Sequence, residues 1–92
     1  MIVNLNQTVD WMRSEDYRDR FRAEYWQLRI RTKRLGDLLT AIKAAQLMDE
    51  PEPPHDVPQY ILQEQYRQMR CYLETLELRA ACEKIELGGG YE

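Results

Sequence analysis

Aromatic and arginine side chains alternate near the start of the chain, a combination that can bind a nucleotide. Five of the nine aromatic residues lie between residues 11 and 26, interleaved with arginines. Aromatic rings stack on nucleobases, and guanidinium groups bind phosphates through paired hydrogen bonds. The side chains offered to such a ligand are Tyr17, Arg18, Arg22 and Trp26. The alternative is that hydrophobic periodicity places them in a core or on a solvated surface.

Basic side chains are concentrated in the first half of the chain. Residues 13–43 hold nine basic and five acidic residues, whereas the rest of the chain holds four basic and eleven acidic ones. Such halves can pair with each other, or the basic half can meet an anionic ligand. The net charge of -3 and the lack of a docking motif argue against binding to duplex nucleic acid.

Enzyme and metal-site motifs are absent from the sequence. It has no glycine-rich phosphate loop and no Gly-x-Ser-x-Gly, and His55 is the sole histidine. Cys71 and Cys82 are eleven residues apart on one predicted helix, about 16 Å along its axis, so they cannot bridge each other. We expect buried or half-buried thiols, no metal and no cofactor. The sequence therefore favours a binding protein over an enzyme.

No signal peptide and no apolar run long enough to cross a bilayer is found in the sequence. The two cysteines form no disulfide framework of the kind that small secreted domains use. We therefore expect a cytoplasmic protein that does not act at a membrane.

Two seams of mostly apolar residues, spaced alternately by four and three, predict the fold. This spacing keeps side chains on one face of a helix, and a proline-rich break separates the seams. The expected fold is all-α, with two long antiparallel helices in one domain. Thr32 either fixes the register of the first seam or bonds back to its own helix. The seams are Phe21, Tyr25, Leu28, Thr32, Leu35, Leu39 and Ile42, then Leu62, Tyr66, Met69, Leu73, Leu76 and Ala80.

Capping and helix-breaking residues predict the boundaries of these elements. Ser14 is expected to cap a helix over 14–48, and an acidic proline-rich connector spans 49–56. Asp56 and Gln59 resemble a capping box for a helix over 57–87, which three glycines end before a flexible tail at 88–92. Residues 1–13 are strand or helix by propensity; we favour an extended lead with a helical turn near residues 8–12.

Apolar residues outside the two seams predict further packing. A bare pair of helices would expose them, so either the N-terminal segment or another copy of the chain is expected to cover them. We favour self-association. Gly36 lies within the first predicted helix and indicates a slight bend or, preferably, a close approach by another backbone. The residues outside the seams are Trp26, Ile30, Leu38, Ala41, Ile61, Tyr72, Leu78 and Ala81.

Two stretches resemble a small family of phage and prophage hairpins. The first reads Asp16-Tyr17-Arg18-Asp19-Arg20-Phe21-Arg22-Ala23-Glu24-Tyr25, followed by Leu28, Leu35, Leu38 and Leu39. The second has Leu62, Gln65, Met69, Tyr72, Leu76 and Arg79. The family includes proteins of crAss-like gut phages and is similar to the hairpin sponges by which phages blunt cyclic-oligonucleotide (CBASS) immunity. The resemblance covers about residues 14–87.

This resemblance implies an oligomeric sponge that holds a cyclic di- or trinucleotide between subunits without catalysis. Tyr17 matches the aromatic position that meets a base, and Lys33 or Arg34 would meet phosphate. Arg67 or Arg70 would serve a second site. A second hypothesis is a phage interaction module that inhibits a host or defence protein through its acidic connector or an aromatic surface. Either protein would act in the cytoplasm of the host cell.

Overall fold

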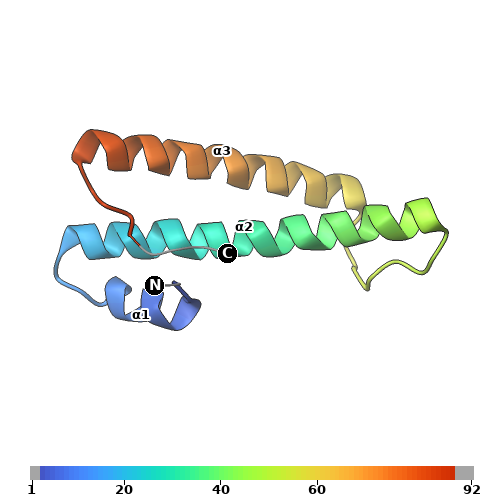
Figure 1. The fold of residues 1–92 in the computed structure, drawn as a ribbon, viewed down its shortest axis with the longest axis horizontal. Helices are drawn as coiled ribbons and strands as arrows, with labels where there is room; N and C mark the ends of the chain where they lie inside the picture. Colours follow the sequence, from blue (N-terminus) through green and yellow to red (C-terminus); the bar gives the residue numbers. More distant parts are fainter. Residues whose placement is uncertain (1–2, 89–92) are drawn as a thin grey trace.

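The computed structural model describes residues 3–88, which form three α-helices and no strand (Figure 1). These are α1 (Leu5–Met12), α2 (Tyr17–Met48) and α3 (Gln59–Glu83). The helices α2 and α3 run antiparallel along each other, as the two seams predict, and α1 packs on the other side of α2 (Figure 1). Within the described range, no helix is both long and apolar enough to cross a bilayer.

The N-terminal segment is more helical than predicted. The helix α1 begins at Leu5, where an extended lead was expected, because Asn4 caps it by accepting a hydrogen bond of 2.9 Å from the backbone of Gln7. Val3, just before the helix, is buried in the core. The N-terminal segment therefore covers part of the core, which was one of the two alternatives for the apolar residues outside the seams, whereas residues 1 and 2 lie outside the described part of the chain.

The start of α2 differs from the prediction by three residues. Asp16, not Ser14, caps the helix, since its carboxylate accepts a hydrogen bond of 2.9 Å from the backbone of Arg18. Ser14 instead holds the preceding turn: its hydroxyl donates to Asp19 and accepts from the backbone of Asp16. Aspartate and serine are both good capping residues, so propensity alone could not separate them.

Both ends of α3 were also predicted wrongly. Pro58 occupies the N-cap without any side-chain hydrogen bond, so Asp56 and Gln59 form no capping box. The helix ends at Glu83 because Lys84 adopts a left-handed conformation with φ of 57°. This turn lets Ile85 fold back into the core, where it is 6% exposed. Burial of Ile85 thus ends the helix before the glycines; residues 89–92 lie outside the described range.

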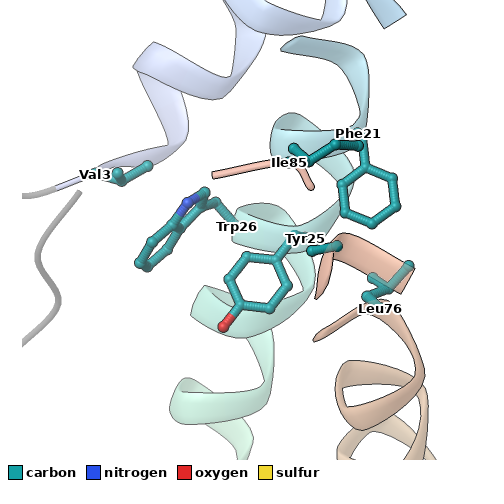
Figure 2. Packing of buried hydrophobic residues seen from close by; sticks show 7 residues of the cluster. Val3, Phe21, Tyr25, Trp26, Leu76 and Ile85 are labelled. Atoms are coloured by element: carbon teal, nitrogen blue, oxygen red, sulfur yellow. The ribbon is translucent and has the colours of Figure 1, made fainter. Parts of the chain in front are cut away.

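The core gathers around the N-terminal half of α2 (Figure 2). Phe21, Tyr25 and Trp26 of α2 meet Leu76 of α3, and Val3 and Ile85 come from the segments outside the helices. The buried side chains of the two seams confirm the predicted contact between α2 and α3. Both chain segments that flank the helices therefore help to close the core.

Residues outside the seams divide into covered and exposed ones. Trp26 is buried, whereas Ile61, Tyr72 and Leu78 of α3 remain exposed. Cys71 and Cys82 are also exposed, contrary to our prediction, because α3 buries only the stripe that faces α2. Coverage of α3 by another copy of the chain stays a prediction.

Thr32, the polar residue of the first seam, bonds back to its own helix, which was the second of its two expected roles. Its hydroxyl donates a hydrogen bond of 2.7 Å to the carbonyl of Leu28 on the same helix. The side chain is buried, so this bond removes the penalty for an unpaired hydroxyl.

The connector between α2 and α3 is ordered by a small polar network. The Nε2 atom of His55 lies 2.9 Å from Glu52 Oε1, and its Nδ1 atom lies 2.8 Å from the carbonyl oxygen of Val57. Gln46 donates to both Glu52 and Gln59, which ties the connector to the ends of the two helices. Because both partners of the imidazole are acceptors, the two bonds form together only when the ring is protonated.

The bond to Glu52 raises the pKa of His55 above its usual 6.5. A raised folded-state pKa adds stability below the unfolded-chain pKa, and this stability disappears as the pH rises through the folded-state value. We expect an NMR titration of this single imidazole to show a midpoint above 6.5, and Glu52→Gln to lower it. A midpoint that is the same in both proteins would show that Glu52 does not hold the ring.

Candidate ligand-binding groove

A groove with a volume of about 320 Å³ runs between α2 and α3. This volume falls at the small end of the range for sites that hold small ligands. Its walls come from one flank of each helix and combine three cationic groups, two carboxylates, a hydroxyl and a tyrosine ring. The lining residues are Arg29, Thr32, Lys33, Tyr66, Arg70, Leu73, Glu74 and Glu77.

Arg29 is held by contacts of its guanidinium with the core and with α3. Its guanidinium lies 5.4 Å from the centre of the Trp26 ring and 5.8 Å from that of Tyr25. It also donates to the Tyr25 hydroxyl and lies 3.8 Å from the Glu77 carboxylate. These contacts fix the guanidinium at the edge of the core and present its charge to the groove.

Tyr25 connects this cation to α3. Its hydroxyl donates a hydrogen bond of 2.9 Å to Glu77, while the ring is buried in the core. Burial, followed by the bond to Glu77, raises the pKa of Tyr25, so the hydroxyl stays protonated at neutral pH. Tyr25 is therefore a structural donor at the base of the groove.

Lys33 and Arg70 face the groove from opposite helices. Lys33 lies one turn after Arg29 and forms an exposed ion pair of 3.0 Å with Asp37. Arg70 lies with its guanidinium 5.9 Å from the centre of the Tyr66 ring. An exposed pair of this kind contributes about 0.3–0.5 kcal/mol, so an anionic ligand can compete for the lysine.

Gly36 gives the Tyr66 ring its place against α2. A Cβ atom at this position would lie 2.9 Å from Cε1 of the ring, closer than carbon atoms approach without displacement. The predicted close packing at Gly36 is confirmed, but the approaching group is a side chain of α3 and not the backbone that we expected. Beyond the ring lies a second hollow of about 250 Å³, lined in part by Lys43 and Gln63. Tyr66 thus lines both hollows.

This contact predicts an energetic coupling between Gly36 and Tyr66. In a Tyr66→Ala background, Gly36→Ala should raise the free energy of unfolding by about 1 kcal/mol, because alanine favours a helix. In the wild-type background the added methyl group must displace the ring, so the gain should shrink or vanish. Urea unfolding of the four proteins measures the difference. An equal gain in both backgrounds would contradict the contact.

Of the site residues predicted from the sequence, only Lys33 and Arg70 meet in this groove. Tyr17 is exposed near the start of α2, where its hydroxyl accepts a hydrogen bond of 2.5 Å from Arg79. Arg18 is exposed beside it, and Arg67 pairs with Glu64 on the surface of α3.

Trp26, Arg22 and Arg34 also lie away from the groove. Trp26 is 4% exposed and donates a hydrogen bond of 2.9 Å to the carbonyl of Leu87, so it belongs to the core. Arg22 donates to the carbonyl of Glu86 and pairs with Asp19. Arg34 lines another hollow, near the start of α1, which has Lys33 in common with the groove.

Sequence reasoning missed Arg29 and Tyr66 as members of the site. The spacing of Arg29 and Lys33 by one turn was visible, but no partner on the second helix was assigned to them. Tyr66 was assigned to the seam, and its spacing of four from Arg70 is the signal that pairs an aromatic ring with a cation. Among residues 3–88, no group of histidine, cysteine and carboxylate side chains is arranged to hold a metal ion.

Comparison with protein-family models matches residues 15–82 to Sequestin. The chain belongs to the Sequestin family. The matched range contains all of α2, all but the last residue of α3, and every residue that lines the groove, whereas it leaves out α1. No curated protein and no solved structure matches the chain. The family name points to sequestration of a ligand.

Proposed function

We propose that this Sequestin-family chain binds and sequesters a cyclic di- or trinucleotide immune signal, as a phage-encoded anti-defence protein acting in the host cytoplasm. It holds the ligand without converting it, so it is not an enzyme and needs no cofactor. The family name supports sequestration, and the cations of the groove support an anionic ligand.

The observation that carries this proposal is that Lys33, Arg70 and the Tyr66 ring line one groove, with Arg70 against the ring. Phosphate groups attract cationic side chains, and a nucleobase can stack on an aromatic ring. A cyclic oligonucleotide carries both groups within one compact molecule. Hollows on both sides of Tyr66 offer room for more than one nucleotide unit.

Self-association belongs to the same proposal. The groove is lined from one side by a single pair of helices, and apolar side chains of α3, including Ile61 and Leu78, are exposed. A second copy that covers these side chains would also enclose a ligand more completely. We therefore infer that the binding form is a homo-oligomer.

Thermal unfolding in the presence of cyclic di- and trinucleotides, with linear dinucleotides as controls, tests the proposal. A ligand at 100 times its dissociation constant stabilises the folded state by about 2.7 kcal/mol, which raises the melting temperature by several degrees. We expect one cyclic nucleotide to be selective and to be recovered unchanged after denaturation. A panel without any shift, or release of a chemically altered nucleotide, would contradict sequestration.

The end of the molecule that carries the connector favours a second candidate, inhibition of a host or defence protein. Leu47, Met48 and Tyr60 are largely exposed there, beside the acidic residues Glu50 and Glu52. Exposed apolar groups rimmed by charge are typical of protein interfaces. If nucleotides give no shift, a pull-down with wild-type protein should capture a partner that Met48→Asp and Tyr60→Asp lose.

A further inference from the structure

A second cleft lies on the other flank of α2. At 3.6 residues per turn, Arg31 lies two residues from both Arg29 and Lys33 and points about 160° away from each, so the cleft does not share the flank of the groove. Its volume is about 370 Å³, within the range of small-ligand sites. Met12 of α1 and Tyr72 of α3 form its sides, and most of its lining comes from α2. All three helices therefore meet around it.

Hydrogen bonds between helices hold the walls of this cleft in place. The side-chain amide of Gln27 donates a hydrogen bond of 3.1 Å to the hydroxyl of Thr8, a fully buried residue of α1. The same amide nitrogen lies 2.8 Å from the sulfur of Met12. On the opposite wall, the hydroxyl of Tyr72 donates to the carboxylate of Glu24. The cleft is thus built by contacts that a ligand does not need to create.

The two cations of the cleft differ in how they are engaged. The guanidinium of Arg20 donates a hydrogen bond of 2.8 Å to the carbonyl of Ser14. Arg31 is exposed and makes no hydrogen bond, ion pair or ring contact with any residue between 3 and 88. Its guanidinium is therefore available to an anion, and a bidentate contact with phosphate needs no competing bond to be broken.

Glu24 and Arg31 lie two turns apart on the same side of α2, about 10 Å along the helix axis. Leu28 lies between them in sequence and is half-buried in the cleft wall. The cleft thus presents an acceptor at one end, beside the engaged Arg20, the unengaged cation Arg31 at the other, and apolar and aromatic surface between them. A ring with N–H donors at one edge and a phosphate at the far end matches this order.

We propose that this cleft is a binding site for a purine mononucleotide, with guanine as its base. Guanine has two adjacent N–H donors on its pairing edge, which suit a carboxylate such as Glu24. Adenine places an unprotonated nitrogen beside its amino group, which a carboxylate repels. The purine ring lies against Tyr72 and Leu28, and the phosphate pairs with Arg31. The site does not depend on the proposed function, because it shares no residue with the groove.

Isothermal titration calorimetry with the full chain tests this site. The probes are GMP, AMP, guanosine and inorganic phosphate, which separate the contributions of the base edge, the ring and the anion. We expect GMP to bind at least tenfold more tightly than each of the other three. The Arg31→Gln variant should lose at least tenfold in GMP affinity. Arg34→Gln, which removes an equally charged residue that lines a different hollow, should bind GMP as the wild type does.

Several results would overturn the site. These are no GMP binding by the wild-type protein, equal binding by Arg31→Gln, an equal loss in Arg34→Gln, or equal affinity for AMP. The groove variant Arg70→Gln provides a further control. If it weakens GMP binding as much as Arg31→Gln does, GMP occupies the groove and the cleft is not its site. A cyclic nucleotide that fails to bind would contradict the proposed function only.

Discussion

Replacing Leu76 with alanine is expected to lower the free energy of unfolding by about 2–5 kcal/mol. The side chain of Leu76 is 0% exposed and lies in the core cluster with Phe21, Tyr25 and Trp26. Its removal leaves a cavity that the rigid aromatic rings cannot fill. Domains of this size are stable by only about 5–15 kcal/mol, so the loss is a large part of the total. Urea unfolding followed by circular dichroism measures it.

Leu78 provides a matched control on the same helix. It is 68% exposed, so Leu78→Ala should change the stability of the isolated chain by no more than about 0.5 kcal/mol. If the two variants lose stability equally, Leu78 is buried in solution, which would indicate that a second copy covers α3. If Leu76→Ala has no effect, α3 does not pack on α2 as described.

The hairpin was predictable because burial follows the helical repeat closely. Phe21 and Tyr25 of the first seam, and Leu76 and Ala80 of the second, are all buried where the spacing placed them. Hydrophobic periodicity predicts long helices reliably, because the spacing of apolar residues by three and four is repeated over many turns. The antiparallel pairing then follows because the connector over 49–58, even when fully extended, is shorter than α2 and cannot return the chain to the start of that helix.

The ends of the elements were less predictable because they depend on contacts distant in sequence. Nothing local requires a left-handed residue at Lys84, which has ordinary helix propensity. The helix stops there because Ile85 and Leu87 then pack back onto α2, where the carbonyl of Leu87 accepts the indole N–H of Trp26. The packing of this segment on α2 thus decides both where α3 ends and the burial of Trp26, which was expected to contact the ligand.

The candidate site was also only partly predictable, because it too depends on contacts between residues distant in sequence. Lys33 and Arg70 were named from the sequence, yet their meeting across one groove depends on the rotation of α3 about its axis. Tyr66 is both a seam residue and a groove residue, because the ring packs on Gly36 while one side lines the groove. A binary division into core and surface misses such a residue. Aromatic content alone favoured Tyr17 and Trp26, which the fold places elsewhere.

Arg70→Gln is expected to weaken binding of the cyclic nucleotide identified by thermal unfolding by about 10- to 150-fold. A hydrogen bond between a charged side chain and phosphate contributes about 1.5–3 kcal/mol, and each 1.4 kcal/mol corresponds to a factor of ten. The substitution keeps the side chain polar and exposed, and the helix tolerates glutamine, so the fold should persist. Calorimetric titration of the wild-type and variant proteins measures the change.

Arg67→Gln is the matched control for this prediction. Arg67 lies about one turn earlier on α3 and does not line the groove; it forms a bidentate pair with Glu64. That pair holds the pKa of Glu64 at about 2, and it leaves the guanidinium occupied. Both variants remove one positive charge from the same helix, so a general electrostatic attraction would weaken in both. A loss confined to Arg70→Gln places the phosphate beside Tyr66. An equal loss in the two variants would mean that charge alone attracts the ligand, and the groove would then not be its site.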